Sequence, residues 1–163
     1  MNKIDSFEGK YAFLSNFYDS PIHQEIKGEI IEYPTVEHAF QACKTMDIEE
    51  RKRIAECPTP GKAKYAGRHV LLRNDWNKIK TDVMLSLVRG KFQWPDLQKK
   101  LLDTGDAYLE EGNTWHDNTW GNCKCSKCAR YQGENRLGKI LMQVRDEARR
   151  GELPVYMENK NDN

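Results

Sequence analysis

One stretch constrains the fold of this chain more than any other, residues 33–46, YPTVEHAFQACKTM. Thr35 stands where a helix can begin, because a threonine hydroxyl at the N-cap accepts a hydrogen bond from a free amide of the first turn. We therefore predict a helix that starts at Val36 and continues towards Met46. Its positions are mostly small or apolar, and a helix that is apolar over so much of its circumference is typical of burial. The rest of the chain is expected to pack around it.

Three polar residues share one edge of this predicted helix: Glu37, Gln41 and Lys44. Their spacing of i, i+4 and i+7 places them side by side. On spacing alone they form a solvated face, where each pair contributes a few tenths of a kcal/mol. The apolar surroundings favour a different interpretation, in which Glu37 and Lys44 line a cleft.

Size, charge and cysteine content narrow the class of protein. The 163 residues suit a compact single domain, residues 1–153, followed by a polar tail, residues 154–163. The net charge of +1 gives no global attraction to nucleic acid or to a membrane. The N-terminus MNKIDSFEGK lacks an apolar signal core and no apolar run could span a bilayer, so a cytoplasmic protein is expected. Five cysteines, an odd number, favour reduced thiols or a metal site over disulfides.

The remaining pattern predicts an α+β fold that is mainly helical, with a few short strands. Apolar positions recur at helical spacing most clearly between Asn74 and Lys91, with Asn74 or Asp75 as the N-cap. Shorter helices are predicted over residues 49–57, 60–65, 95–105 and 135–150, and strands near Ile4 and over residues 28–33 and 108–110.

Two irregular segments carry groups that could contact a ligand. Ser15 and Asn16, between Leu14 and Phe17, can form the lip of an apolar pocket, although a turn that satisfies its own backbone is the simpler interpretation. Residues 113–138 cannot be regular over most of their length, and loops this long in compact domains tend to be functional.

These groups together suit the hydrolysis of a glycosidic bond. Positive charge develops on the sugar in that reaction, and a carboxylate can stabilise it or deprotonate the attacking water. A flat leaving base also needs an aromatic platform. The chain offers two carboxylates, three candidate anion-binding cations and one stacking surface: Glu37, Asp117, Lys44, Arg68, Arg136 and Trp120.

Several motifs together resemble the NADAR family, the YbiA-like proteins. They are FLSNFY at residues 13–18, VEHAFQACK at 36–44, the helix of Trp76, DNTWG at 117–121 and ENRLGKILMQVR at 134–145. The match spans nearly the whole chain in the family's order. It implies a compact α+β fold and an N-glycosidase that needs no cofactor. Some members cleave phosphoribosylated intermediates of riboflavin biosynthesis, and others remove ADP-ribose from guanine bases.

The resemblance also implies site residues and a partner. Glu37 is the expected catalytic carboxylate, with Asp117 as the second. The predicted ligand contacts, from the resemblance and from the residues above, are Ser15, Asn16, Phe17, Gln41, Lys44, Arg68, Trp76, Trp120, Gly121, Asn135 and Arg136. The expected ligand is a ribosylated base or an ADP-ribose-containing molecule, either free or as a modified base in nucleic acid.

The run CKCSKC stands where shorter relatives of that family have a glycine-rich stretch. Cys123, Cys125 and Cys128 could supply three of the four ligands of a structural zinc ion, with His116, Cys43 or Cys57 as the fourth. Because no second cysteine pair is evident, the pattern favours three reduced cysteines in a packed loop.

Two other classes of function compete with an enzyme. A binding module could recognise ADP-ribose or a nucleotide without turnover, but such a module would have little use for both Glu37 and Asp117. The basic clusters at 51–53 and 149–150 could indicate a nucleic-acid-binding protein. Both clusters are short and offset by acidic residues, which favours solvated helix faces.

Overall fold

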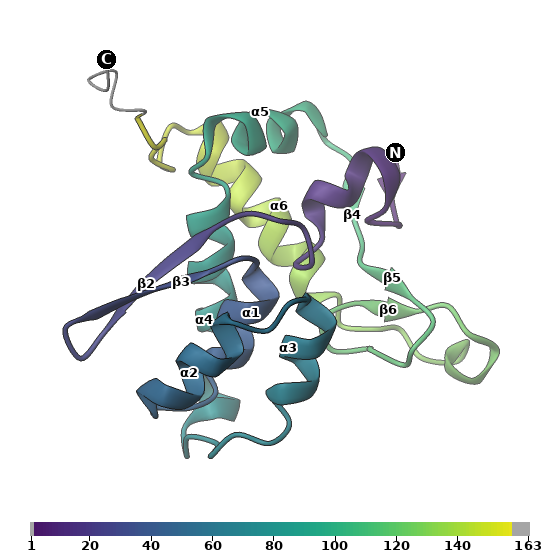
Figure 1. Ribbon diagram of the computed structural model, residues 1–163. Coiled ribbons are helices and arrows are strands. Elements are labelled where there is room, and N and C mark those ends of the chain that lie inside the picture. Colours follow the sequence, from purple (N-terminus) through teal and green to yellow (C-terminus); the bar gives the residue numbers. More distant parts are fainter. Residues whose placement is uncertain (1, 158–163) are drawn as a thin grey trace.

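The computed structural model describes residues 2–157 and has the α+β, mainly helical fold that the sequence predicts (Figure 1). The elements in chain order are β1 (Lys3–Ile4), η1 (Gly9–Leu14), β2 (Ile22–Ile26), β3 (Glu29–Tyr33), α1 (Val36–Ala42), α2 (Ile48–Ala55), α3 (Pro60–Ala66), α4 (Trp76–Lys91), α5 (Pro95–Asp103), β4 (Tyr108–Leu109), β5 (Gly112–Asn113), β6 (Asn122–Cys123), η2 (Ser126–Cys128) and α6 (Arg136–Arg149). Here η denotes a short 3₁₀ helix. Every helix expected from the sequence is present.

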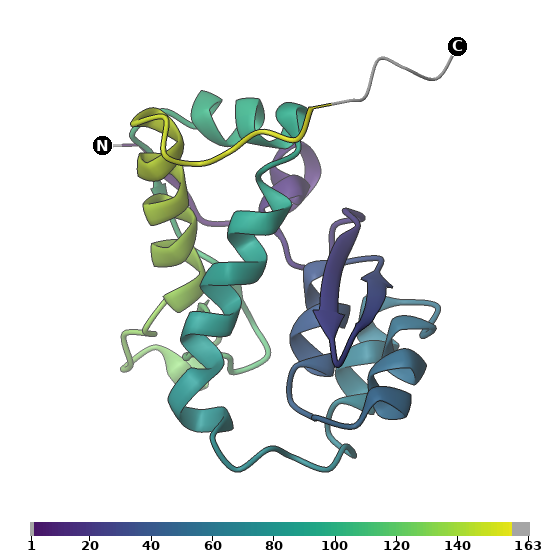
Figure 2. The same cartoon turned by 90° about the vertical axis from the view of Figure 1, so that its left-hand side faces the viewer.

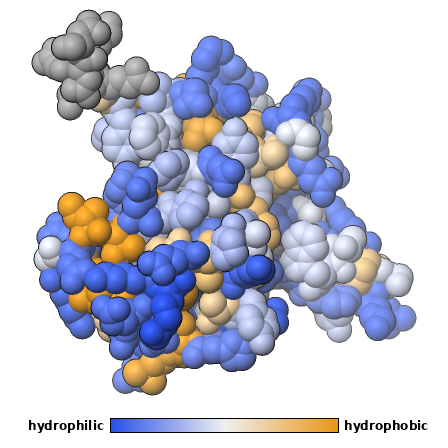
Figure 3. All heavy atoms as spheres, viewed as in Figure 1, coloured by the Kyte–Doolittle hydropathy of each residue, from blue (hydrophilic) through white to orange (hydrophobic). Residues whose placement is uncertain are grey.

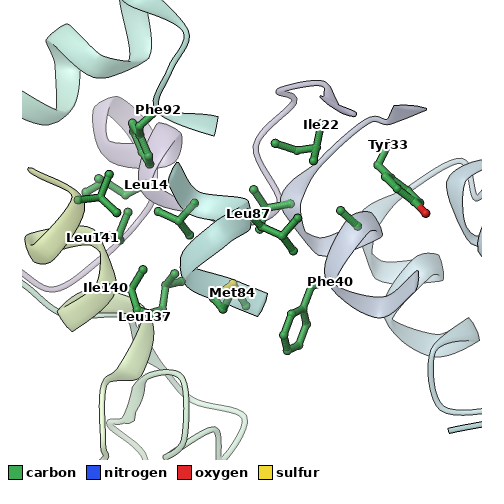
Figure 4. Close-up of a cluster of buried hydrophobic side chains, with 14 of the residues drawn as sticks. Leu14, Ile22, Tyr33, Phe40, Met84, Leu87, Phe92, Leu137, Ile140 and Leu141 are labelled. Atoms are coloured by element: carbon green, nitrogen blue, oxygen red, sulfur yellow. The ribbon is translucent and has the colours of Figure 1, made fainter. Parts of the chain in front are cut away.

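Helix α4 is the centre of the core. Helix α6 packs along one side of it and α1 along the other, and Figure 2 shows α1, α2, α3 and the β2–β3 hairpin grouped together on the α1 side. The buried side chains of Met84 and Leu87 lie between Phe40 of α1 and Leu137 of α6 (Figure 4). Helix α4 therefore joins two halves of the molecule, and the ends of α1 and α6 face a common space.

The strands form three separate two-stranded sheets. β1 pairs with β4 and β5 with β6, both in parallel, while β2 and β3 form an antiparallel hairpin with Ile22 opposite Tyr33. Strand β2 was not predicted from the sequence. Its turn residues Lys27 and Gly28 have φ angles of 49° and 81°, which is the left-handed backbone that a tight two-residue hairpin turn requires. A lysine in the first of these positions is not a typical turn signal.

The start of α1 is as predicted, but its end is not. The Thr35 side chain accepts a hydrogen bond from the His38 amide at 3.1 Å, which confirms the N-cap. The helix ends at Ala42, with Cys43 as C-cap, so Lys44 follows the helix in a turn. At α4, Asp75 occupies the N-cap position but its carboxylate binds the Arg73 guanidinium at 2.6 Å instead of capping the helix.

The last described residues lie against the domain. The Tyr156 ring packs against Trp94 at a tilt of 58°, with ring centroids 5.0 Å apart, and the Tyr156 amide donates to the Gln93 carbonyl. The rest of the predicted tail, residues 158–163, lies outside the described part of the chain.

The face in Figure 3 is largely hydrophilic, with apolar side chains gathered near the β2–β3 hairpin. Among the described helices, none has both the length and the apolar character needed to cross a membrane.

Candidate active site

A cavity of about 480 Å³ opens where α1, α4 and the start of α6 meet the irregular segment after β4. This volume is within the range of small-molecule sites, about 300–1,000 Å³. Three groups of side chains line it: carboxylates, lysines and aromatic rings. The principal lining residues are Ser15, Asn16, Phe17, Glu37, Phe40, Gln41, Lys44, Lys64, Trp76, Lys80, Glu111, Trp115, Asp117 and Trp120.

Glu37 is the most deeply placed of the carboxylates. Its residue is 8% exposed, and one carboxylate oxygen accepts a hydrogen bond of 2.8 Å from the Gln41 side-chain amide. Burial raises the pKa of Glu37, while the Gln41 hydrogen bond and the charges of Lys64 and Lys44 oppose that rise. Gly67 packs against Gln41, because a Cβ at that position would overlap the amide. The edge of α1 therefore lines a cleft, as the apolar surroundings predicted.

Three lysines give the cavity a cationic side. Lys44 follows α1, Lys64 is on α3 and Lys80 is on α4, and all three line the cavity and are half-buried. Burial lowers the pKa of Lys44, and the Glu37 carboxylate acts in the opposite direction. Arg68 lies close enough to influence Lys44 but is exposed and does not line the cavity. Three converging ammonium groups suit the binding of a phosphate.

Glu111 is a third carboxylate in the cavity and was not predicted from the sequence. Burial, followed by the negative charge of Asp117, raises the pKa of Glu111 to about 7. Its backbone amide donates to the Asn135 side chain at 3.0 Å, and its side chain receives a weak hydrogen bond from Asn113 at 3.4 Å. A carboxyl group with this pKa can donate a proton near neutral pH.

Asp117 also lines the cavity, but one of its carboxylate oxygens already accepts hydrogen bonds from the backbone. The Oδ1 atom accepts hydrogen bonds from the amides of Thr119 and Trp120, at 3.1 and 2.9 Å. This arrangement fixes the turn that carries the Trp120 indole. Asp117 therefore positions the aromatic side of the cavity.

The aromatic side is formed by three rings in a row. Phe40 lies between Trp76 and Trp120, with ring centroids 5.0 Å and 5.2 Å away. Trp115 lines the cavity as well, and the Lys64 ammonium lies 6.0 Å from its ring centroid. The rings offer surfaces on which a flat base can stack.

Both the sequence and the fold of this chain are similar to those of known proteins. The NADAR domain model matches residues 5–149 of the sequence. The chain belongs to the NADAR family. The NMR structure of the Escherichia coli protein YbiA superposes with a TM-score of 0.73 at 32% identity, and the match covers 98% of this chain and 93% of that one.

Two curated relatives of this NADAR chain differ in length. N-glycosidase YbiA of Escherichia coli (strain K12) is 37% identical over 140 residues, which cover 84% of this chain and 81% of that protein. The riboflavin biosynthesis protein PYRR, chloroplastic, of Zea mays is 32% identical over 151 residues, which cover 84% of this chain and 23% of that protein. The sequence-based assignment to the family is confirmed.

The structure brings nine of the predicted site residues to the cavity of this NADAR fold and leaves four outside its lining. Arg68 is exposed beside it. Gly121 lies behind Glu111, where a Cβ would overlap the carboxylate. The buried Asn135 side chain donates to the Leu109 carbonyl and accepts from the Glu111 amide. Arg136 bonds Thr81 of α4 and Glu134. None of these four residues lines the cavity, and two of them, Gly121 and Asn135, contact Glu111, which does.

Proposed function

We propose that this chain is a hydrolase that cleaves the bond between the ribose carbon and the base nitrogen of a phosphoribosylated riboflavin-biosynthesis intermediate. One observation carries the proposal: a buried carboxylate, Glu37, faces the same cavity as three lysines and a row of aromatic rings. An N-glycosidase for such a substrate needs all three groups, because it binds a phosphate, a sugar that becomes positively charged, and a flat base.

The carboxylates divide the proton transfers between them. In hydrolysis the carbon–nitrogen bond breaks, a water molecule attacks the sugar carbon, and the nitrogen takes up a proton. Glu37 stabilises the positive sugar and accepts the proton of the attacking water, while Glu111, whose pKa of about 7 leaves about half of the molecules protonated at neutral pH, donates a proton to the departing nitrogen. Asp117 holds the Trp120 turn and keeps the pKa of Glu111 high.

The lysines and rings orient the substrate along the cavity. The phosphate is held by Lys44 with Lys64 and Lys80, which all lie on the cationic side. The base lies against Trp120. This orientation brings the sugar carbon between the two ends, next to Glu37. The name of the maize relative supports a riboflavin-pathway substrate, and the name of the E. coli relative supports cleavage of an N-glycosidic bond.

Incubation with two substrates tests this function. We expect release of ribose 5-phosphate and free base from the phosphoribosylated pyrimidine intermediates, measured by liquid chromatography and mass spectrometry. An oligonucleotide that carries ADP-ribosylated guanine is incubated in parallel. Turnover of the oligonucleotide alone would contradict the proposed substrate and keep the N-glycosidase chemistry. Binding of both without turnover of either would contradict the enzyme and favour a reader of ADP-ribose or nucleotides.

A further inference from the structure

A second cluster of reactive side chains lies next to the cavity, in the irregular segment that projects beside β5 and β6 (Figure 1). His116, Cys123, Cys125 and Cys128 each offer one ligand atom, and all four atoms lie within 4.8 Å of one another. The His116 Nδ1 atom is 3.3 Å from the sulfurs of Cys125 and Cys128 and 3.9 Å from that of Cys123. All three cysteines are free thiols.

We propose that these four residues bind a structural zinc ion. Tetrahedral zinc has bonds of about 2.3 Å to sulfur and about 2.0–2.1 Å to nitrogen, which places its ligand atoms about 3.6–3.8 Å apart. The nitrogen–sulfur distances in the cluster lie on both sides of that value. Three thiolates and one imidazole complete the coordination of zinc, so the site is closed to water and is not catalytic.

The backbone around the cluster supports this assignment. His116 has a φ of 69°, a left-handed conformation that is uncommon for a residue with a side chain, and it turns the imidazole towards the three sulfurs. Cys123 is placed by pairing of β6 with β5, and its amide donates to the Asn118 side chain at 2.9 Å. Cys128 is placed by η2. Three independent local structures thus converge on one point, which a packed loop of reduced cysteines would not require.

The position of the zinc site gives it a role in the cavity. His116 lies between Trp115 and Asp117, both of which line the cavity. A metal that fixes His116 therefore also fixes the segment that carries the aromatic and acidic side of the site. This role rests on geometry alone and does not depend on which substrate the enzyme uses.

Metal analysis of the purified protein tests the proposal. The chain is expressed in zinc-supplemented medium and purified without chelators, and we expect elemental analysis to give about one zinc ion per chain. Cys125→Ser and Cys128→Ser should each lower the zinc content several-fold or abolish it. Cys57→Ser is the matched control, because the Cys57 thiol lies outside the cluster and donates to the Arg53 carbonyl. It should retain the wild-type zinc content.

A second test measures Tm of the wild-type chain with and without metal, so its result does not depend on whether the cysteine variants fold. Removal of the metal with a chelator should lower Tm by about 5 °C or more, and added zinc should restore it, because an ion that binds the native state stabilises it. Cobalt(II) in place of zinc should give the visible absorption of a tetrahedral thiolate site. Absence of metal after reconstitution, an unchanged Tm, or a disulfide within the cluster would each overturn the proposal. Loss of N-glycosidase activity alone, with zinc retained, would bear only on the proposed function.

Discussion

Replacement of Glu111 by glutamine should change how activity depends on pH. The proposed mechanism needs a protonated Glu111, and its pKa is raised to about 7 by burial and by Asp117. With that pKa, about nine tenths of the molecules are protonated at pH 6, about one tenth at pH 8 and about one hundredth at pH 9. The wild-type rate should therefore fall about tenfold from pH 6 to pH 8, and about tenfold more by pH 9.

Glutamine keeps the shape of the protonated acid but cannot donate its proton to the leaving nitrogen. We expect turnover of Glu111→Gln at pH 6 to be lower by about 10²–10⁴-fold, the usual contribution of one general acid. The decline between pH 6 and pH 9 should disappear in the variant. Rates are measured as kcat/KM, from the initial release of free base at substrate concentrations well below KM, because the pH dependence of kcat/KM reports the pKa values of the free enzyme.

The same substitution has a second consequence, for stability. Because the pKa of Glu111 rises on folding from 4.5 to about 7, the folded state binds the proton more tightly, and the wild-type loses stability as pH rises through this interval. Glu111→Gln does not titrate, so its Tm relative to wild-type should rise between pH 5 and pH 8. Glu8→Gln is the control, because Glu8 is an exposed carboxylate at the cavity rim. A variant that keeps the wild-type decline in rate would refute the role of Glu111.

Three further substitutions test two residues of the site and one buried lysine outside the cavity lining. Lys44→Ala should weaken kcat/KM for phosphorylated substrates far more than for their dephosphorylated nucleosides, and equal losses would refute its role at the phosphate. Trp120→Ala should weaken both forms alike by about 1–3 kcal/mol in kcat/KM, and a loss confined to phosphorylated substrates would contradict stacking on the base. Lys91 is buried, its ammonium donates to the Ser15 carbonyl at 2.8 Å, and burial lowers its pKa to about 7, so stability is lost as pH falls from about 10.5 to about 7. Lys91→Met should therefore raise Tm more at pH 6 than at pH 10, and an equal change at both values would contradict that cause.

Local patterns in the sequence predicted the helices well because caps and recurring apolar positions are local signals. The apolar positions of α4 and the Thr35 cap of α1 are signals within a few residues of each other, so they needed no knowledge of the fold. The end of α1 was predicted too late, since Cys43 and Lys44 are compatible with a helix. Their turn is stabilised by a distant partner, the Arg73 amide, which donates to the Lys44 carbonyl.

The site residues that were not predicted from the sequence are positioned by long-range contacts. Glu110 and Glu111 are adjacent in the sequence, and no local pattern distinguishes them. In the structure Glu110 is neutralised by Lys3 and Lys124, whereas Glu111 enters the cavity. Lys64 likewise lies on a short predicted helix, and the sequence does not indicate which face of that helix points towards Glu37.

Local patterns in the sequence could not predict the fourth candidate zinc ligand either. The sequence left His116, Cys43 and Cys57 as equal alternatives. The structure places Cys43 next to Gln24 and Cys57 next to Arg53, while the left-handed backbone at His116 brings its ring to the three thiols. That conformation depends on the folded loop and cannot be predicted from the residue type.

Turnover by Glu37→Gln is the most direct test of the proposed active site. Glutamine preserves the size of the side chain and removes the group that accepts the proton, so kcat on the phosphoribosylated intermediate should fall by at least about 10²-fold with substrate binding largely retained. Glu25→Gln, on the exposed side of β2, controls for the loss of one surface carboxylate. A Glu37→Gln enzyme with near-normal kcat would contradict the assignment of this cavity as the active site of an N-glycosidase.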